Sequence, residues 1–153
     1  MKKILALVIV LAALALPAFD FAGKEMDALL DAIAEVESGN NPNAVGDRGK
    51  AVGAYQLHEI YVKECNRIAK TDYAAGDRRD PAKSREITRL VLTYWGKRLE
   101  KDLGRPATAG DIAKIHNGFR WWKRPAAGNE EYFARLAAYE AKVLAVLKKQ
   151  GNE

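Results

Sequence analysis

Residues 35–57 of the chain read EVESGNNPNAVGDRGKAVGAYQL. One acid, Glu37, stands where an apolar helical pattern ends, and a long run of turn-forming residues follows it. Counting back from Glu37 by four and by seven residues reaches Ile33 and Leu30, so the helical period places these three side chains on one stripe. Glu35 falls on the polar side of the same helix. The stretch therefore predicts a helix that carries one carboxyl group to an apolar surface, followed by a loop that returns toward it.

The predicted position of Glu37 suits acid catalysis. A carboxyl group held against apolar neighbours loses hydration of its charged form, which favours the protonated acid that can donate a proton. The alternative is a frayed helix end at which Glu37 turns to solvent. The residues that follow Glu37 favour the first interpretation.

The chain after its first 18 residues reads as one mainly helical domain. It contains no internal repeat, and its apolar residues recur mostly at intervals of three and four. No alternating run is long enough for a confident strand, and residues 38–52 hold at most a small hairpin. Asp80-Pro81 is a good helix start, and Thr108 with Asp111 resembles a capping box. Helices are predicted over residues 24–37, 58–70, 81 to just before Gly104, 108 to just before Gly118, and 129–149.

The first 18 residues have the order of an export signal. Two lysines precede an apolar run, residues 4–16, that is short for a membrane span, and small residues follow at Ala18 and Ala22. Cleavage after Ala18 is favoured, because Asp20 would stand at the third position before the later cut. An uncleaved N-terminal anchor is the alternative. Either way we expect an exported protein, periplasmic or extracellular, with its folded domain over residues 23–150.

The length, net charge and cysteine content of the chain indicate how many domains, which partners and which disulfides to expect. Removing 18 residues from a chain of 153 leaves 135, which suits one domain with one core. The signal holds two lysines and no acid, so the net charge of +5 becomes +3 for the mature part. This mild basicity suits a polyanionic cell envelope and gives no reason to expect nucleic acid. We expect a monomer that is free of the membrane once the signal is cut. Cys65 is alone, so it can form no intramolecular disulfide and is expected to be buried.

Four elements resemble, in order, the motifs of the transglycosylase SLT domain of the lysozyme-like superfamily, which includes soluble lytic transglycosylases and goose-type lysozymes. Residues 37–45 are similar to the family's catalytic Glu-Ser-Gly followed by Asn-Pro and Ala-Val. Residues 53–57 resemble its Gly-Leu-Met-Gln-Ile element, and residues 115–118 its Tyr-Asn-Ala-Gly element. Tyr139 with Val143-Leu144 falls where a late Tyr-Val and Val-Leu element would stand.

The resemblance implies a fold and an activity. The fold is mainly α, α+β in the lysozyme-like sense, with at most a small β-hairpin beside an active-site cleft. The activity is that of a peptidoglycan glycosidase, which cleaves the β-1,4 bond between N-acetylmuramic acid and N-acetylglucosamine in glycan strands and needs no cofactor and no metal. Glu37 would protonate the departing oxygen and then act as base toward water or toward the 6-hydroxyl of the sugar.

The resemblance also implies supporting site residues. Gln56 and Asn117 offer both donors and acceptors to the amide and hydroxyl groups of an amino sugar, with loop-bracing hydrogen bonds as the alternative. Ser38 would hold the Glu37 carboxyl group or the substrate's acetamido group, or else simply end its helix. Tyr139 would hydrogen-bond near Glu37 and orient it, or else pack in the core.

Asp47 is a departure from the family pattern. It puts a second carboxylate into a longer and more charged linker, and this linker together with His116-Asn117-Gly118 resembles invertebrate-type lysozymes, which use a Glu and a following Asp. Those proteins are rich in cysteine, whereas this chain has one. If Asp47 faces Glu37, a hydrolase with two carboxylates results; if it points to solvent, a lytic mechanism with Glu37 alone is favoured. A turn residue that caps its own loop is the third interpretation.

Other chemistries have little support. His58 and His116 are far apart in sequence and Cys65 has no evident partner, so a zinc site is not expected. In the basic, aromatic segment of residues 119–125, exposed aromatic faces would stack on sugars and cations would attract stem-peptide carboxylates. Trp121 or Trp122 is the hypothetical glycan contact, with packing as the alternative. A non-catalytic wall-binding protein is the remaining rival, but a pure binder has no use for an acid on an apolar stripe.

Overall fold

The structure is a computed structural model that describes residues 18–151. Except for Ala18, the predicted export signal lies outside these residues, so it stays a prediction. The described part is mainly α, as the sequence predicts, with a single two-stranded hairpin. Its helices coincide closely with the predicted ones: α1 (Lys24–Ser38), α2 (Glu59–Ala69), α3 (Pro81–Leu103), α4 (Ala109–Asn117) and α5 (Glu130–Gln150).

The helix ends are set by the local signals in the sequence. The Asp80 carboxylate accepts a hydrogen bond from the backbone N–H of Lys83 at 2.9 Å, which satisfies a free donor at the start of α3. Thr108 Oγ1 accepts from the backbone N–H of Asp111, and the Asp111 carboxylate accepts from that of Thr108. The capping box predicted for α4 is therefore present, with Asp in place of the usual Glu.

The small hairpin predicted after α1 is confirmed. Strands β1 (Val45–Gly46) and β2 (Ala51–Val52) pair antiparallel, and a short 3₁₀ helix, η1 (Asp47–Gly49), joins them. Backbone hydrogen bonds between Val52 and Leu57 in both directions then close a tight turn over residues 53–56. This turn brings the chain back toward the end of α1.

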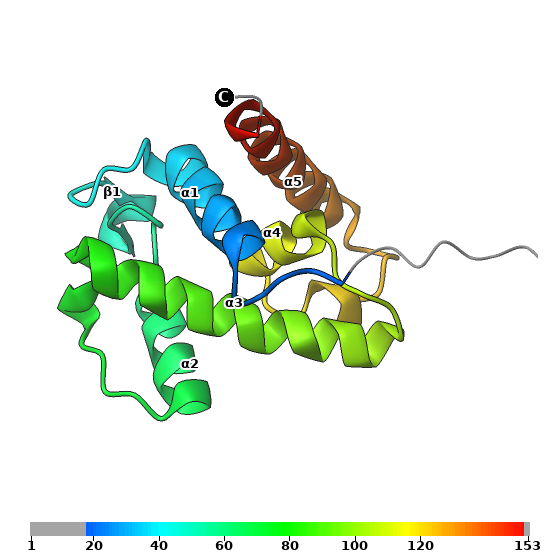
Figure 1. Cartoon of the computed structure of the whole chain (residues 1–153), viewed down its shortest axis with the longest axis horizontal. Helices are drawn as coiled ribbons and strands as arrows, with labels where there is room; N and C mark the ends of the chain where they lie inside the picture. Colours follow the sequence, from blue (N-terminus) through cyan, green and yellow to red (C-terminus); the bar gives the residue numbers. More distant parts are fainter. Residues whose placement is uncertain (1–17, 152–153) are drawn as a thin grey trace, which may run out of the picture.

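Two further 3₁₀ helices, η2 (Ala75–Arg79) and η3 (Trp121–Lys123), have no counterpart among the predicted elements. In Figure 1, α3 crosses the molecule, with α2 below it and α1, α4 and α5 above it. Helix α5 packs against both α1 and α4, while the hairpin lies beside the C-terminal end of α1. The ends of α1 and α4 and the start of α2 thus meet near the hairpin.

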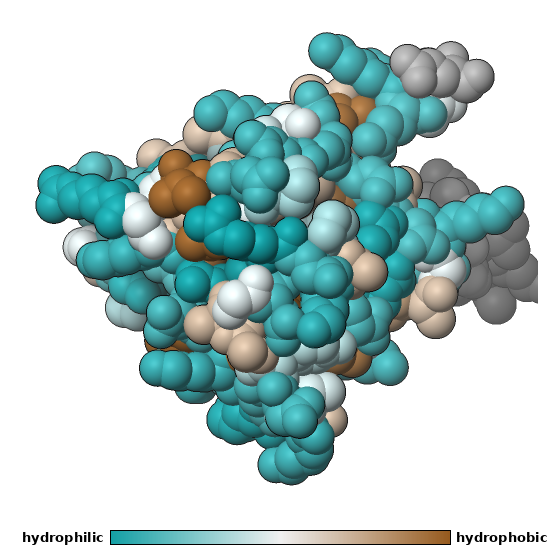
Figure 2. Space-filling view, turned by 90° about the vertical axis from the view of Figure 1, so that its left-hand side faces the viewer, coloured by the Kyte–Doolittle hydropathy of each residue, from teal (hydrophilic) through white to brown (hydrophobic). Residues whose placement is uncertain are grey.

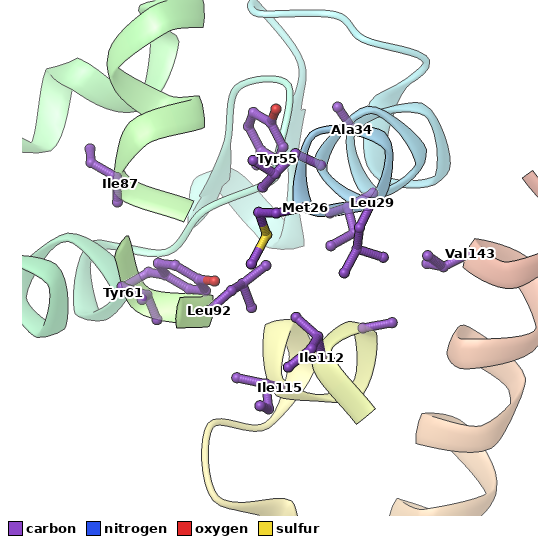
Figure 3. Close-up of a cluster of buried hydrophobic side chains, with 14 of the residues drawn as sticks. Met26, Leu29, Ala34, Tyr55, Tyr61, Ile87, Leu92, Ile112, Ile115 and Val143 are labelled. Carbon is purple, nitrogen blue, oxygen red and sulfur yellow. The ribbon is translucent and has the colours of Figure 1, made fainter. Parts of the chain in front are cut away.

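All five helices contribute to one core. Figure 3 shows Met26 and Leu29 of α1 among side chains from α2, α3, α4 and α5. Cys65 is fully buried in this core, as predicted, and its Sγ lies 3.8 Å from Thr71 Oγ1. The core also holds Phe19, with Phe21 packed against it, so packing begins at the residue that follows the favoured cleavage position.

Arg78 is a buried cation that holds the hairpin to η2. Its guanidinium donates to the carbonyl oxygens of Ala75, Lys50 and Leu57, at 2.7, 3.0 and 3.0 Å. A buried charge is tolerated when its donors are satisfied in this way. The segment between β1 and α2 is therefore held in place by the hydrogen bonds of Arg78 rather than by long paired strands.

The surface on the hairpin side is largely hydrophilic, with small separate hydrophobic areas (Figure 2). Val45 and Ile60 are the large apolar residues exposed on the hairpin and at the start of α2. Within residues 18–151, no helix combines the length and the apolar composition that crossing a membrane requires.

Candidate active site

A cleft of about 490 Å³ lies where α1, the hairpin, α2 and α4 meet. Polar groups from four separate segments converge on it, and most of its remaining lining is apolar or aromatic. Such a cleft is the usual form of a small-molecule or saccharide site. It is lined by Glu37, Ala51, Gln56, His58, Ile60, Tyr61, His116, Asn117, Gly118 and Phe119.

Glu37 lies in the last turn of α1 with its side chain 18% exposed. The residues four and seven positions before it, Ile33 and Leu30, are fully buried, whereas Glu35 is exposed. The helical period therefore predicted the direction of Glu37 correctly. The interpretation as a frayed helix end does not hold, because Gly39 closes the helix in the left-handed conformation with its N–H bonded to the carbonyl of Glu35.

Ser38 fixes the end of α1 against the loop that carries Gln56. Its hydroxyl donates to the carbonyl oxygen of Ala54 at 2.8 Å and accepts from the backbone N–H of Asn41 at 3.0 Å. Ser38 is not among the residues that line the cleft. The structure thus places its hydroxyl on backbone groups, where it sets the position of Glu37 relative to Gln56.

His116 is the nearest cation-forming group to Glu37. Its side chain is 5% exposed, and its Nε2 lies 3.5 Å from Glu37 Oε1 and 3.1 Å from the carbonyl oxygen of Tyr55. Nδ1 lies 3.2 Å from the hydroxyl of Tyr61. A carbonyl oxygen can only accept, so Nε2 carries the hydrogen, and in the neutral ring Nδ1 then accepts from Tyr61.

The pKa of His116 is lowered from its usual value, because burial disfavours the imidazolium; the charge of Glu37 and the bond to the Tyr55 carbonyl oppose this only in part. His116 is therefore held as a neutral ring with a defined tautomer. It keeps one N–H directed at the region of the Glu37 carboxylate without adding a full positive charge to the cleft.

We expect His116 to make the stability of the protein depend on pH below 6.5. The pKa of His116 is lower in the folded protein than in the unfolded chain, so below pH 6.5 the unfolded chain binds a proton that the folded protein does not bind. The free energy of unfolding is therefore at its full value above pH 6.5 and decreases as the pH falls. One proton gives a slope of at most ~1.4 kcal/mol per pH unit. Urea unfolding at pH 7.5 and 5.5 measures it, and His116→Gln should have the flatter slope. Equal slopes in the two proteins would contradict the assignment.

Tyr139 of α5 packs over the other side of the site, with its ring stacked at 6.3 Å from that of His116. Its hydroxyl is buried and makes no hydrogen bond to any group in residues 18–151. Burial raises the pKa of Tyr139 well above its usual range, and the nearby Glu37 carboxylate raises it further. The phenol therefore stays protonated beside Glu37, as a donor available to the carboxylate.

The Tyr139→Phe variant distinguishes the two possible roles of Tyr139, orientation of Glu37 and packing in the core. We expect kcat for wall cleavage to fall about tenfold, because the variant has no phenol that can donate a hydrogen bond to the Glu37 carboxylate during the reaction. We expect the free energy of unfolding to change by less than ~1 kcal/mol, because the deleted hydroxyl is buried without a good partner. Tyr73→Phe, remote from the cleft lining, is the matched control. If Tyr139→Phe loses stability but keeps full activity, its role is packing alone.

Gln56 and Asn117 both reach the cleft, as predicted. Gln56 adopts a left-handed backbone conformation at the end of the tight turn, and its Nε2 donates to the carbonyl oxygen of Gly53 at 3.0 Å. Part of its amide therefore braces the loop, while the side chain still lines the cleft. Asn117 is the exposed last residue of α4, at the end that also carries His116.

Asp47 lies at the start of η1 and its side chain is 55% exposed. Its Oδ2 lies 3.3 Å from Nε2 of His58, and it is not among the residues that line the cleft, whereas His58 is. The structure thus brings Glu37, Gln56 and Asn117 together with Tyr139 behind them, and places Asp47 on the rim in contact with His58.

Two histidines of the cleft are not among the site residues predicted from the sequence. The separation of His58 and His116 along the chain argues only against a zinc site, and both line the cleft. The signal for His116 was its place beside Asn117 in the element that resembles Tyr-Asn-Ala-Gly. Trp121 and Trp122 do not line the cleft: both pack against the core, and Trp122 Nε1 donates to Asp102 at 3.1 Å.

No group of three or more His, Cys, Asp or Glu side chains within residues 18–151 is arranged to hold a metal ion. A mainly helical domain with a small hairpin beside a cleft that contains one acid has the architecture of lysozyme-like proteins. The chain matches the Transglycosylase SLT domain family over residues 22–152, nearly its whole length, and belongs to that family.

The family is one of lytic-transglycosylase-type peptidoglycan glycosidases, so it is enzymatic and its substrate is peptidoglycan. The comparison with curated proteins found no match. The comparison with solved structures found none either.

Proposed function

We propose that this protein cleaves the β-1,4 bond between N-acetylmuramic acid and N-acetylglucosamine as a lytic transglycosylase, with Glu37 as general acid and then general base. One observation carries the proposal: a single carboxyl group, that of the mostly buried Glu37, lines the cleft, with Nε2 of His116 3.5 Å away. Family membership supports the substrate class.

The proposed reaction needs two proton transfers. Glu37 first donates its proton to the glycosidic oxygen as that bond breaks and oxocarbenium character develops on the sugar. The Glu37 carboxylate then removes the proton of the 6-hydroxyl of the same muramic acid, whose oxygen bonds to the anomeric carbon. The acid is regenerated, and the product is a 1,6-anhydro sugar with no water consumed.

The environment of Asp47 supports the single-acid mechanism. A hydrolase with two catalytic carboxylates needs both of them to face the scissile bond from opposite sides. Among the residues that line the cleft, Glu37 is the one carboxylate, and the Asp47 side chain is half-exposed against His58. The contact with His58 Nε2 at 3.3 Å holds the Asp47 carboxylate at the rim of the cleft.

Mass spectrometry of the fragments released from purified walls tests the outcome. We expect 1,6-anhydro ends throughout digestion, in a reaction that needs no added metal. Reducing ends would contradict the lytic mechanism and favour the hydrolase. Walls that bind the protein but do not lose turbidity would instead support the wall-binding alternative.

We also propose that the mature protein acts outside the cytoplasm, in the periplasm or beyond it, as a monomer. The order of residues 1–18 supports export, and the burial of Phe19 supports cleavage directly before that residue, since a later cut would remove a core side chain. N-terminal sequencing of the exported protein identifies the cleaved bond.

A further inference from the structure

A second groove of about 520 Å³ adjoins the cleft, between α2, α3 and the segment around η3. The two hollows share two lining residues, Ile60 and Phe119, so they lie side by side on the surface. We call this second hollow the lateral groove. A chemical group attached to a sugar in the cleft could therefore extend past these two side chains into the lateral groove.

The lateral groove carries an excess of positive charge. Four cations line it, Arg67, Arg98, Arg120 and Lys123, against two acids, Glu64 and Asp102. Both acids are already neutralised by neighbours within the groove. An anion that enters would therefore meet a surplus of two positive charges.

Each acid is held by short contacts. Glu64 receives two hydrogen bonds from the guanidinium of Arg67, at 2.8 and 2.7 Å, and a third from Trp95 Nε1 at 3.0 Å. Asp102 lies 2.9 Å from Lys123 Nζ and 3.4 Å from Arg98 Nε. These contacts fix the walls of the groove. They involve three of the four cations, so one cation of the groove has no carboxylate beside it.

The remaining cation is Arg120. Its guanidinium carbon lies 5.8 Å from the centre of the Trp95 ring, and no carboxylate within residues 18–151 forms an ion pair with it. The ring of Trp95 stacks at 6.4 Å on that of Phe119, with the planes 8° apart. Phe119 in turn lies on the wall of the cleft, so an aromatic platform leads from the cleft to Arg120.

We propose that the lateral groove binds the peptide carried by the muramic acid of the glycan in the cleft, through the free carboxylates of that peptide. In a peptide-bearing strand the carboxyl group of each muramic acid is taken up in the amide bond to its peptide, so the negative charges that a cationic groove can recognise lie in the peptide, which carries several carboxylates. Arg120 has five donors and suits such a group, and the aromatic platform suits short alkyl side chains. This inference rests on the proposed peptidoglycan activity and adds a preference for peptide-bearing strands.

The segment over residues 119–125 keeps one of the two roles considered for it from the sequence. Trp121 and Trp122 pack against the core, which was the alternative to a glycan contact, while the cations Arg120, Lys123 and Arg124 are exposed. The attraction predicted between these cations and peptide carboxylates is retained, with Arg120 beside the platform of Trp95 and Phe119.

A binding experiment with paired ligands tests the inference. Two ligands are compared: glycan oligosaccharides that carry their peptides, and the same oligosaccharides after an amidase has removed the peptides, which leaves a single carboxylate on each muramic acid. Each is titrated calorimetrically into the full-length Glu37→Gln protein at low salt, so that the ligand is not consumed. We expect the peptide-bearing form to bind about fivefold or more tightly, with a preference that weakens as salt is raised. Arg120→Gln added to this protein should reduce the preference to about one.

Arg135→Gln is the matched control, because Arg135 is likewise exposed beside an aromatic ring, at 5.6 Å from Tyr132, but outside the lateral groove. It should keep the full preference. Equal binding of the two ligands by the parent protein overturns the inference, and so does an Arg120→Gln preference equal to that of the control. Cleavage of stripped glycan by the wild type tests the proposed function separately, since that ligand lacks the peptide.

Discussion

Replacing Glu37 by Gln is expected to lower the rate of wall cleavage about a thousandfold while the protein stays folded. The change removes one ionisable proton and keeps the shape of the side chain. General acid and base catalysis contributes ~10²–10⁴ to a rate, and in the proposed mechanism one group serves in both steps. Glu37 is the one carboxylate among the residues that line the cleft, so no other acid there can replace it. Turbidity loss of purified walls measures the rate, and circular dichroism with thermal unfolding confirms the fold.

Asp47→Asn is the comparison variant that shows whether a second carboxylate takes part in catalysis. Asp47 is half-exposed and contacts His58, and we expect its amide variant to keep activity within about threefold, the effect of a surface charge near a site. Loss of activity by Asp47→Asn equal to that of Glu37→Gln would show a second catalytic carboxylate. Retention of activity by Glu37→Gln would remove Glu37 from the mechanism altogether.

The sequence was informative wherever a short-range rule decides the structure. The helical period placed Glu37 inward and Glu35 outward, because both belong to one regular helix whose inner stripe is fully apolar. Capping chemistry located the starts of α3 and α4, because Asp80 and Thr108 satisfy backbone donors only three residues away. Rules of this kind need no knowledge of the rest of the fold.

Contacts between segments distant in sequence could not be read in this way. His116 touches Glu37 only because α1 and α4 both pack against α5 with their C-terminal ends directed at one place. The contact of Asp47 with His58 depends on three successive left-handed residues in η1, whose conformation follows from the hairpin rather than from local preference alone. The inward packing of Trp121 and Trp122 likewise depends on α3 and α4, which lie before them in the chain.

The turn that returns Gln56 to the cleft depends on one glycine. Gly53 has a φ of +83°, and a Cβ at this position would lie 1.9 Å from the backbone carbonyl oxygen of Arg78. Arg78 cannot move away cheaply, because its side chain also donates to the carbonyls of Lys50 and Leu57. The backbone of the turn and that of η2 are thus in direct contact, with room for hydrogen alone.

Gly53→Ala is therefore expected to destabilise the protein by ~3 kcal/mol. Left-handed backbone strain contributes about 1 kcal/mol of this, and the overlap with a rigid backbone atom contributes the remainder. A domain of this size should unfold at a temperature lower by roughly 10 °C, and urea unfolding gives the free energy directly. The variant should also have lower activity than the wild type at a temperature where it is still folded, because the displaced turn carries Gln56.

The Gly49→Ala variant separates the effect of backbone strain from the effect of steric overlap. Gly49 has a similar φ of +91°, but a Cβ there would meet no atom within 4 Å, so the variant bears the backbone strain without the overlap. We expect it to lose about 1 kcal/mol and only about 3 °C. If the two variants unfold at the same temperature, the contact between Gly53 and Arg78 does not hold the loop, and the position of Gln56 must be set by the hydrogen bonds of Ser38 and Val52 instead.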